Sequence, residues 1–350
     1  MTAATAPLPL TYSAPELEHL LGSDWATLLW TAYRWMRTAR ALDDRMVALQ
    51  RQGRVGFYGP ATGQEAVSIA AGLATHENDW VFPGLREQLV ALVRGHPLGT
   101  YLHHLFADGL DPSLGRQMPC HPTAREVRYV SMSSCVGTQI SHAVGCAYGF
   151  RFRKDNAVTL AFFGDGATSV NDFHAGMNFA GVYRLPVVFC CTNNQWAISL
   201  PVEKQSRVAE LAEKGAAYGM PARRVDGSDF IQTYFKLAEA LEAARRGEGP
   251  SFIEFVVYRM SAHSTSDDPS RYQPVDWQER AAQHDPVFRM EHLLGGLGLL
   301  SEDLVKEMDR QIDATLREAI ATAERTAPPA PDTLERDVFA ASTSAPSLEG

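Results

Sequence analysis

The chain has 350 residues, 45% of them hydrophobic and 21% charged, an ordinary globular composition that allows a large core. Its net charge of −9 and the lack of a basic block make nucleic acid an unexpected partner. Five cysteines without a C-x-x-C pair favour a reduced compartment, and no apolar run approaches the roughly 20 residues that span a membrane.

The N-terminal part of the chain is predicted to be mostly helical. Residues 1–14 are predicted to form a flexible arm, and Leu and Met residues at helical spacing predict helix within 15–50. A glycine-rich loop, RQGRVGFYGPATG, occupies 51–63, and the small residues that follow predict a helix at 63–74. Residues 86–107 are again predicted to be helical.

Residues 108–135 contain Gly, Pro and Ser without periodicity, and such a long irregular stretch in a compact domain is typical of a functional segment. From about residue 136, strands and helices alternate. Continuous apolar runs at 157–163 and 185–191 are typical of buried parallel strands. The other predicted elements are helices at 138–150, 170–184 and 229–246, strands at 223–226 and 251–259, and an amphipathic helix through 277–325.

This alternation predicts an α/β fold with a doubly wound, mostly parallel sheet, helices on both faces, and helical arms at both ends. We expect one domain at 15–325 and a tail at 326–350. The N-terminus has neither the apolar core of a secretory signal nor the Arg-rich pattern of a transit peptide, so we expect a cytoplasmic protein.

Polar residues follow two of the predicted strands. FFGDGATS places Asp165 after the first strand, and CTNNQWAIS places Asn194 after the next. A right-handed strand–helix–strand connection makes these loops neighbours at the edge where parallel sheets bind ligands. A carboxylate, an amide oxygen and the backbone carbonyl of Trp196 suit Mg²⁺ that is shared with phosphates.

The residues around Asp165 predict what the metal would carry. Gly164 and Gly166 let the backbone turn tightly and approach a ligand closely. The backbone N–H groups of Ala167 to Ser169, at the predicted helix start, can bind phosphate oxygens. GDG and NN are common turn sequences when each stands alone, but together in this strand context they predict a site for a metal-bound diphosphate.

The segment from GDG to NN resembles the thiamine-diphosphate-binding motif. Within that superfamily the chain resembles the α subunit of branched-chain 2-oxo acid dehydrogenase E1, over about residues 15–325. The resemblance includes QGRVGFY, VFPGLRE, GRQMPCH, VGTQISHAVGCAYG and YRMSAHSTSDDPSRYQ, and GRQMP and HSTSDD are closer to branched-chain than to pyruvate enzymes. It implies thiamine diphosphate and Mg²⁺ as cofactors.

The resemblance also implies roles for single residues. Arg86 matches an arginine that binds the diphosphate, while Ser134 and Val136 match positions at the aminopyrimidine ring, with Val136 as the wedge that bends the cofactor. His263 matches a catalytic histidine near the thiazolium, and its ordinary pKa suits acid–base work at neutral pH. Phe57 matches a residue that lines the pocket for an aliphatic side chain.

Further matches concern loops around this site. Ser133, Thr138 and Gln139 match a structural potassium site of some members. Ser264 matches a serine that mitochondrial relatives phosphorylate, and we expect no dedicated kinase here because no mitochondrial presequence is visible. Arg259, with Asp267 and Arg271, is expected to order the loop around His263 through ion pairs.

Three departures from the family pattern affect the expected pocket. Val170 stands where relatives usually have an acidic or amide side chain. Leu85 stands where branched-chain relatives often have an aromatic one, and Ala262 where some have a second histidine. These differences bear on the preferred 2-oxo acid and leave the predicted metal site unchanged.

The family reaction is oxidative decarboxylation of a 2-oxo acid and reductive acylation of a lipoyl group on the E2 acyltransferase. In heterotetrameric members a glutamate of the β subunit completes the cofactor site, and no second α/β domain is visible in this chain. The resemblance therefore implies an α₂β₂ assembly with an E1 β subunit, a lipoyl domain of E2 as a further partner, and no activity for the chain alone.

Two other functions remain open. The chain could be the α subunit of a pyruvate or acetoin E1, or, in a different class, a non-catalytic scaffold that binds Mg²⁺ and diphosphate. His263 argues against the scaffold, which needs no histidine at the thiazolium. An NAD-binding Rossmann protein is disfavoured because no G-x-G-x-x-G follows an early strand.

Overall fold

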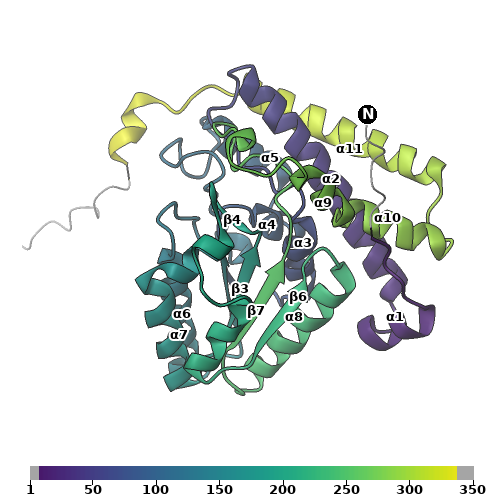
Figure 1. Cartoon of the computed structure of the whole chain (residues 1–350). Helices are drawn as coiled ribbons and strands as arrows, with labels where there is room; N and C mark the ends of the chain where they lie inside the picture. The colour runs from purple at the N-terminus through teal and green to yellow at the C-terminus, as the bar shows by residue number, and fades with distance from the viewer. Residues whose placement is uncertain (1–7, 337–350) are drawn as a thin grey trace, which may run out of the picture.

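A five-stranded parallel sheet lies at the centre of the computed structural model, which describes residues 8–336 (Figure 1). Its strands lie in the order β1-β2-β3-β7-β6, and every neighbouring pair is parallel. They are β1 (Trp80–Phe82), β2 (Thr159–Gly164), β3 (Val187–Asn193), β7 (Ser251–Val256) and β6 (Ala222–Asp226). The predicted α/β fold is therefore confirmed.

Helices cover both faces of the sheet, because the apolar side chains of the central strands alternate between two buried layers. Ala161 and Phe163 of β2 pack with the helices of one face, while Leu160 and Phe162 pack with those of the other. The first face carries α6 (Thr138–Arg153) and α7 (Asn171–Tyr183), and the second carries α3 (Glu65–Ala74), α4 (Gln88–Val93) and α8 (Phe230–Arg245).

The direction of winding reverses between β3 and β7. The units β2-α7-β3 and β6-α8-β7 cross the sheet in opposite directions, so right-handed connections place α7 and α8 on opposite faces. Ligands of doubly wound sheets bind beside such a reversal, at the carboxyl ends of the strands. The paired residues Asn193 and Val256 end β3 and β7, so the loops that follow them define the expected site.

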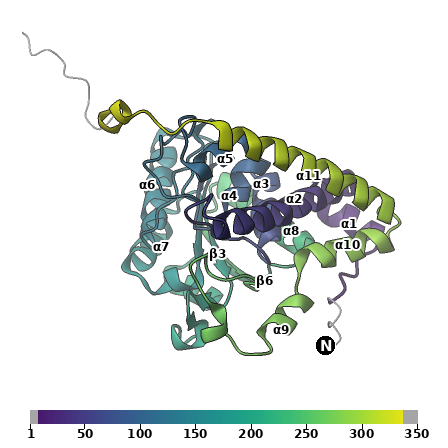
Figure 2. The ribbon, with the colours of Figure 1, turned by 90° about the horizontal axis from the view of Figure 1, so that it is seen from above.

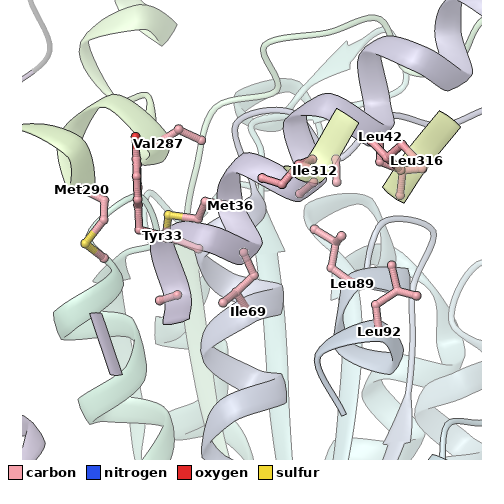
Figure 3. Packing of buried hydrophobic residues seen from close by; sticks show 14 of the residues in the cluster. Tyr33, Met36, Leu42, Ile69, Leu89, Leu92, Val287, Met290, Ile312 and Leu316 are labelled. Atoms are coloured by element: carbon pink, nitrogen blue, oxygen red, sulfur yellow. The ribbon is translucent and has the colours of Figure 1, made fainter. Parts of the chain in front are cut away.

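A further helical layer packs outside α3 (Figure 2). Figure 3 shows Met36 and Leu42 of α2 among apolar side chains of the neighbouring helices, including Ile69, Met290 and Leu316. Because α3 is buried between this layer and the sheet, its small side chains permit close packing on both sides. The layer comprises α2 (Trp25–Arg51), α5 (Leu98–Phe106), α10 (Pro286–Gly296) and α11 (Glu302–Arg325), with α1 (Ala14–Leu21) and α9 (Trp277–Gln283) beside it.

The amphipathic helix predicted through 277–325 is divided in the structure into α9, α10 and α11. Asp285 caps α10 by accepting from two backbone N–H groups, and Pro286 occupies the first helical position. Ser301 caps α11 by accepting from the backbone N–H of Leu304. The predicted helix at 86–107 is likewise divided into α4 and α5 by the sequence Gly-His-Pro at 95–97.

Residues 8–14, the described part of the predicted arm, lie against the rest of the molecule. The Arg289 guanidinium donates to the Leu8 carbonyl at 3.0 Å, and the Tyr12 hydroxyl donates to Asp229 at 2.6 Å. The remaining parts of the predicted arm and tail, 1–7 and 337–350, lie outside the described residues. Within the described chain, no helix is both long enough and apolar enough to cross a membrane.

Arg40 of α2 joins the outer helices to α3 through two buried carboxylates. Its guanidinium pairs with Glu65 at 2.8 Å and with Asp285 at 3.0 Å. Removing one member of a buried ion group leaves uncompensated charge, so we expect Arg40→Met to cost about 3–5 kcal/mol of unfolding free energy, measured by urea denaturation. The control is Arg45→Met, whose more exposed pair with Asp313 should contribute less than about 1 kcal/mol. Equal losses in the two variants would contradict the buried role of Arg40.

Candidate active site

Loops that follow four parallel strands meet at the carboxyl edge of the sheet. Arg86 follows β1, Asp165 follows β2, Asn194 follows β3, and His263 lies in the long loop after β7. Gly164 is paired with Thr192 across β2 and β3, so Asp165 and Asn194 leave neighbouring strands at almost the same level. The structure therefore brings the predicted residues of four distant sequence segments to one edge.

Asp165 is 1% exposed and begins the 3-10 turn η2 (Asp165–Ser169). Its Oδ2 oxygen has no hydrogen-bond partner among the described residues. Burial raises the pKa of this carboxyl to about 6, while the positive charge of Arg259 acts in the opposite direction. A buried carboxylate oxygen without a donor is unfavourable, so this oxygen fits a cation.

The backbone around Asp165 is held by packing rather than by an unusual conformation. Neither Gly164 nor Gly166 has a positive φ, so their backbone conformations do not require glycine. What requires glycine at position 166 is the lack of room for a side chain. A Cβ on Gly166 would lie 2.9 Å from the Cβ of Ala197 in the hairpin of β4 (Trp196–Ala197) and β5 (Leu200–Pro201). The α-helix begins only at Asn171, so the N–H groups of Ala167 to Ser169 belong to η2.

Asn194 lies at the same edge of the sheet, directly after β3. Its Nδ2 donates to Gln64 Oε1 at 3.3 Å, and its Oδ1 accepts from the backbone N–H of Trp196 at 3.2 Å. The Trp196 carbonyl accepts from Arg259 Nη1 at 3.4 Å, which is long for a hydrogen bond. Each of the two oxygens keeps a further lone pair that can bind a cation.

Arg86 carries a buried positive charge at the site and is 5% exposed. Its guanidinium donates to the backbone carbonyl of Pro60 and, at 2.7 Å, to that of His263. Burial lowers its pKa to about 10, and the charge of Arg259 acts in the same direction.

Arg259 carries a second buried guanidinium, and its Nε has no partner among the described residues. It donates to the Ile198 carbonyl at 2.8 Å and to the Tyr272 hydroxyl at 2.6 Å. The expected ion pair with Asp267 is absent from the described structure, because Tyr272 lies between them and donates to Asp267 at 2.5 Å. Within residues 8–336 neither Arg259 nor Arg86 forms an ion pair with a carboxylate, and two such charges fit an anion.

His263 is half-buried against Arg86. Its Nδ1 lies 3.3 Å from Arg86 Nη2, and because a guanidinium only donates, Nδ1 accepts and Nε2 carries the proton. Burial, followed by the charges of Arg86 and Arg259, lowers the pKa of His263 to about 4. The imidazole is therefore neutral at pH 7, because its pKa lies well below the ordinary value of histidine.

The loop that carries His263 is fixed by short contacts. The backbone N–H of His263 donates to Asp267 Oδ2 at 2.8 Å. Ser264 is buried, and its hydroxyl accepts from the Ser266 N–H at 3.3 Å. The prediction that no dedicated kinase acts on Ser264 stays a prediction.

Two further predicted residues lie near the start of α6. Val136 is 61% exposed, and the Ser134 hydroxyl is hydrogen-bonded to Nε2 of His121. Gly137 caps the helix with φ of +94°, and a Cβ there would lie 2.5 Å from the side chain of Val170. Val170 thus packs against the helix start instead of supplying the polar side chain of the family pattern.

The residues predicted to hold potassium lie at the same helix start. Gln139 donates through Nε2 to the Phe162 carbonyl at 2.9 Å, while its buried Oε1 has no partner within the described residues. The Ser133 hydroxyl accepts from the Cys135 N–H, and Thr138 is the first residue of α6. Phe57, by contrast, packs half-buried against the outer helical core.

Two residues that the sequence analysis did not identify, Glu87 and Lys214, form hydrogen bonds with residues at this edge. Glu87 is buried and accepts from the Arg86 N–H at 3.2 Å and from the Thr192 hydroxyl at 3.3 Å. Lys214 donates to the hydroxyl of Thr168 at 2.8 Å and so fixes η2. A signal for Glu87 was present, since it directly follows Arg86 within the segment VFPGLRE.

Fold and site together are suited to a metal-associated anion at the carboxyl edge of a doubly wound sheet. No group of three His, Cys, Asp or Glu side chains in the described chain could hold a metal, so Asp165 would be joined by amide and carbonyl oxygens. The unpartnered Asp165 oxygen and the two unpaired guanidiniums fit the two parts of a metal diphosphate.

Comparison with known proteins agrees with this class. Residues 33–332 match the family described as dehydrogenase E1 component. The chain is 40% identical over 310 residues to 2-oxoisovalerate dehydrogenase subunit alpha of Bacillus subtilis (strain 168), covering 88% of this chain and 94% of that protein.

Two further relatives have similar names. The chain is 41% identical over 303 residues to 3-methyl-2-oxobutanoate dehydrogenase subunit alpha of Mycobacterium tuberculosis, covering 85% of this chain and 79% of that protein. It is 38% identical over 292 residues to 2-oxoisovalerate dehydrogenase subunit alpha of Pseudomonas aeruginosa, covering 83% and 71%. The chain belongs to the dehydrogenase E1 component family, and this membership implies dependence on thiamine diphosphate.

The low pKa of His263 predicts a pH dependence of stability. Its folded pKa of about 4 lies below its unfolded value of about 6.5, so protons favour the unfolded chain. The stabilisation is therefore complete above pH 6.5 and is lost as the pH falls through 4. In urea titrations across this range, His263→Asn should lose less stability on acidification than the wild type, and a pKa near 6.5 in an NMR titration would contradict the assignment.

Proposed function

We propose that the chain is the α subunit of a branched-chain 2-oxo acid dehydrogenase E1, which oxidatively decarboxylates the 2-oxo acid and reductively acylates the lipoyl group of E2. The names of the relatives support the substrate class. The observation that carries the chemistry is the opposite charge of the groups at this edge, where the open Asp165 oxygen and the unpaired guanidiniums of Arg86 and Arg259 follow strands of one parallel sheet.

The residues divide between the metal and the diphosphate. The Asp165 carboxylate, the Asn194 amide oxygen and the Trp196 carbonyl would hold Mg²⁺ through the hard oxygen atoms that this ion prefers. Arg86 would bind diphosphate oxygens as a fork of N–H donors, together with backbone N–H groups of Gly166 and Ala167. The open Gln139 oxygen is the support for a potassium ion beside Ser133 and Thr138.

Thiamine diphosphate, when bound, supplies the electron sink for decarboxylation. His263 would then act as a hydrogen-bond donor through Nε2, because Arg86 occupies Nδ1 and the imidazole is neutral. A neutral imidazole can polarise a carbonyl or carboxylate oxygen without carrying charge of its own. Val136 and Phe57 would contribute apolar surface, beside the cofactor and the substrate side chain respectively.

An E1 β subunit is the proposed partner that completes the site. An exposed aromatic group on the outer face of α6 and α7 supports a protein partner, since Tyr148, Phe179 and Tyr183 contact one another with ring centroids 4.5–5.7 Å apart. Phe152 and Val182 are exposed on the same two helices. Contiguous apolar surface of this kind marks interaction sites. The lipoyl domain of E2 and a cytoplasmic location remain parts of the same proposal.

The function is tested by turnover of 3-methyl-2-oxobutanoate with the β partner and an artificial electron acceptor. Activity should require both Mg²⁺ and thiamine diphosphate, and Asp165→Ala should lower it by at least about 100-fold because a metal ligand is lost. The control is Asp172→Ala, a carboxylate in the first turn of the adjacent helix α7. Cofactor binding without turnover of any 2-oxo acid would favour the non-catalytic scaffold, and preference for pyruvate would favour the alternative E1.

The isolated chain should show no turnover, because no further α/β unit in the described residues supplies a second half of the site. Coexpression with the β subunit should restore activity and give an α₂β₂ mass in light scattering. Phe152→Ser should weaken this assembly if the aromatic group is part of the interface. Full turnover by the purified chain alone would refute the heterotetramer.

A further inference from the structure

One irregular segment, 57–63, joins Arg86 to the loop that carries His263. The Pro60 carbonyl accepts from the Arg86 guanidinium. Tyr58 is paired with Thr265 in both directions, since its carbonyl accepts at 2.9 Å and its N–H donates at 3.2 Å. The position of both functional residues therefore depends on the backbone of this segment.

This segment has no helix or strand to hold its shape. It ends at Gly63, whose φ of +92° favours glycine and whose Cβ would lie 2.1 Å from the Tyr258 carbonyl. The Thr62 carbonyl accepts from the Met260 N–H at 3.3 Å. Its conformation must be stabilised by side chains, because regular backbone hydrogen bonding is absent within it.

The two hydroxyl groups of the segment converge on one carboxylate of helix α2. The Tyr58 hydroxyl donates to Asp43 Oδ1 at 2.8 Å, and the Thr62 hydroxyl donates to Asp43 Oδ2 at 2.7 Å. Asp43 is 3% exposed and forms no ion pair within residues 8–336. Each oxygen of the carboxylate is thus used to fix one end of the segment.

Stability alone does not explain an acidic residue at this position. Burial raises the pKa of Asp43, while the bonds from Thr62 and Tyr58 and the charge of Arg40 act against that shift. Burying a carboxylate without an ion pair lowers the free energy of unfolding, and an apolar side chain would suit the surrounding helical core better. What the carboxylate uniquely offers is two charge-assisted acceptors in a fixed geometry.

Asp43 also acts electrostatically on the site. Its negative charge is among the influences that raise the pKa of Arg86 against the effect of burial. The same residue therefore offsets part of the buried positive charge and fixes the segment whose carbonyl binds it.

We propose that Asp43 is a positioning residue, which holds segment 57–63 and through it sets Arg86 and the His263 loop for the anionic cofactor. The cofactor part of this inference rests on the proposed function. The hydrogen bonds that Asp43 accepts come from Tyr58 and Thr62 rather than from Arg86 or His263, so it acts through the segment from the outer helical layer.

The test uses the α₂β₂ assembly with Asp43→Asn, which keeps the shape of the side chain but removes its charge and one acceptor. We expect faster amide hydrogen exchange in 57–63 and 258–267, and a Kd for Mg²⁺–thiamine diphosphate raised roughly 10- to 100-fold, as for other residues that orient a binding group. Thr62→Val removes one hydroxyl and should give a smaller effect. Added to Asp43→Asn, it should change little more, since both act through one contact.

The matched control is Asp309→Asn, which weakens another contact of α2, the 2.6 Å ion pair between Arg37 and Asp309. It should lower stability without changing either readout. Unchanged exchange in both segments of Asp43→Asn, or lost stability with an unchanged Kd, would overturn the proposal. If the wild type does not bind Mg²⁺–thiamine diphosphate, the proposed function fails, and the exchange data alone decide whether Asp43 positions the segment.

Discussion

The structure of this site depends on two buried guanidinium groups that have no carboxylate partner in the described chain. Arg86 and Arg259 instead draw the backbone carbonyls of Pro60, His263 and Ile198 toward themselves. Such dipoles offset part of the desolvation of the charges, and a bound anion would offset more. Segment 57–63 and the loops after β3 and β7 therefore each place a backbone carbonyl against a buried positive charge.

The sequence predicts the frame of this arrangement well, for a local reason. The strands β2 and β3 are continuous apolar runs, and the polar residues Asp165 and Asn194 that follow them mark the carboxyl edge without any long-range information. Elements marked by only a few residues in the sequence were not predicted. Strand β1 has only three residues, and the helix predicted at 277–325 is interrupted by the caps at Asp285 and Ser301.

The chemistry of single residues could not be predicted in the same way, because it depends on partners far along the chain. His263 has a low pKa through burial and through Arg86, which is 177 residues away in sequence. Arg259 was expected to pair with an acidic residue, yet Tyr272 intervenes. Family resemblance names such positions, but only the packed structure shows which tautomer, charge and neighbour each of them has.

Opposite charges on adjacent strand ends give the site an inherent coupling. A cation bound by Asp165 alone would add positive charge beside Arg259, and an anion bound by Arg259 alone would add negative charge beside the Asp165 carboxylate. Each arrangement relieves one buried charge and worsens the other, whereas a metal and a diphosphate bound together relieve both. The geometry therefore favours a ligand in which the two charges arrive as a pair, and this is the form in which Mg²⁺ binds phosphate groups.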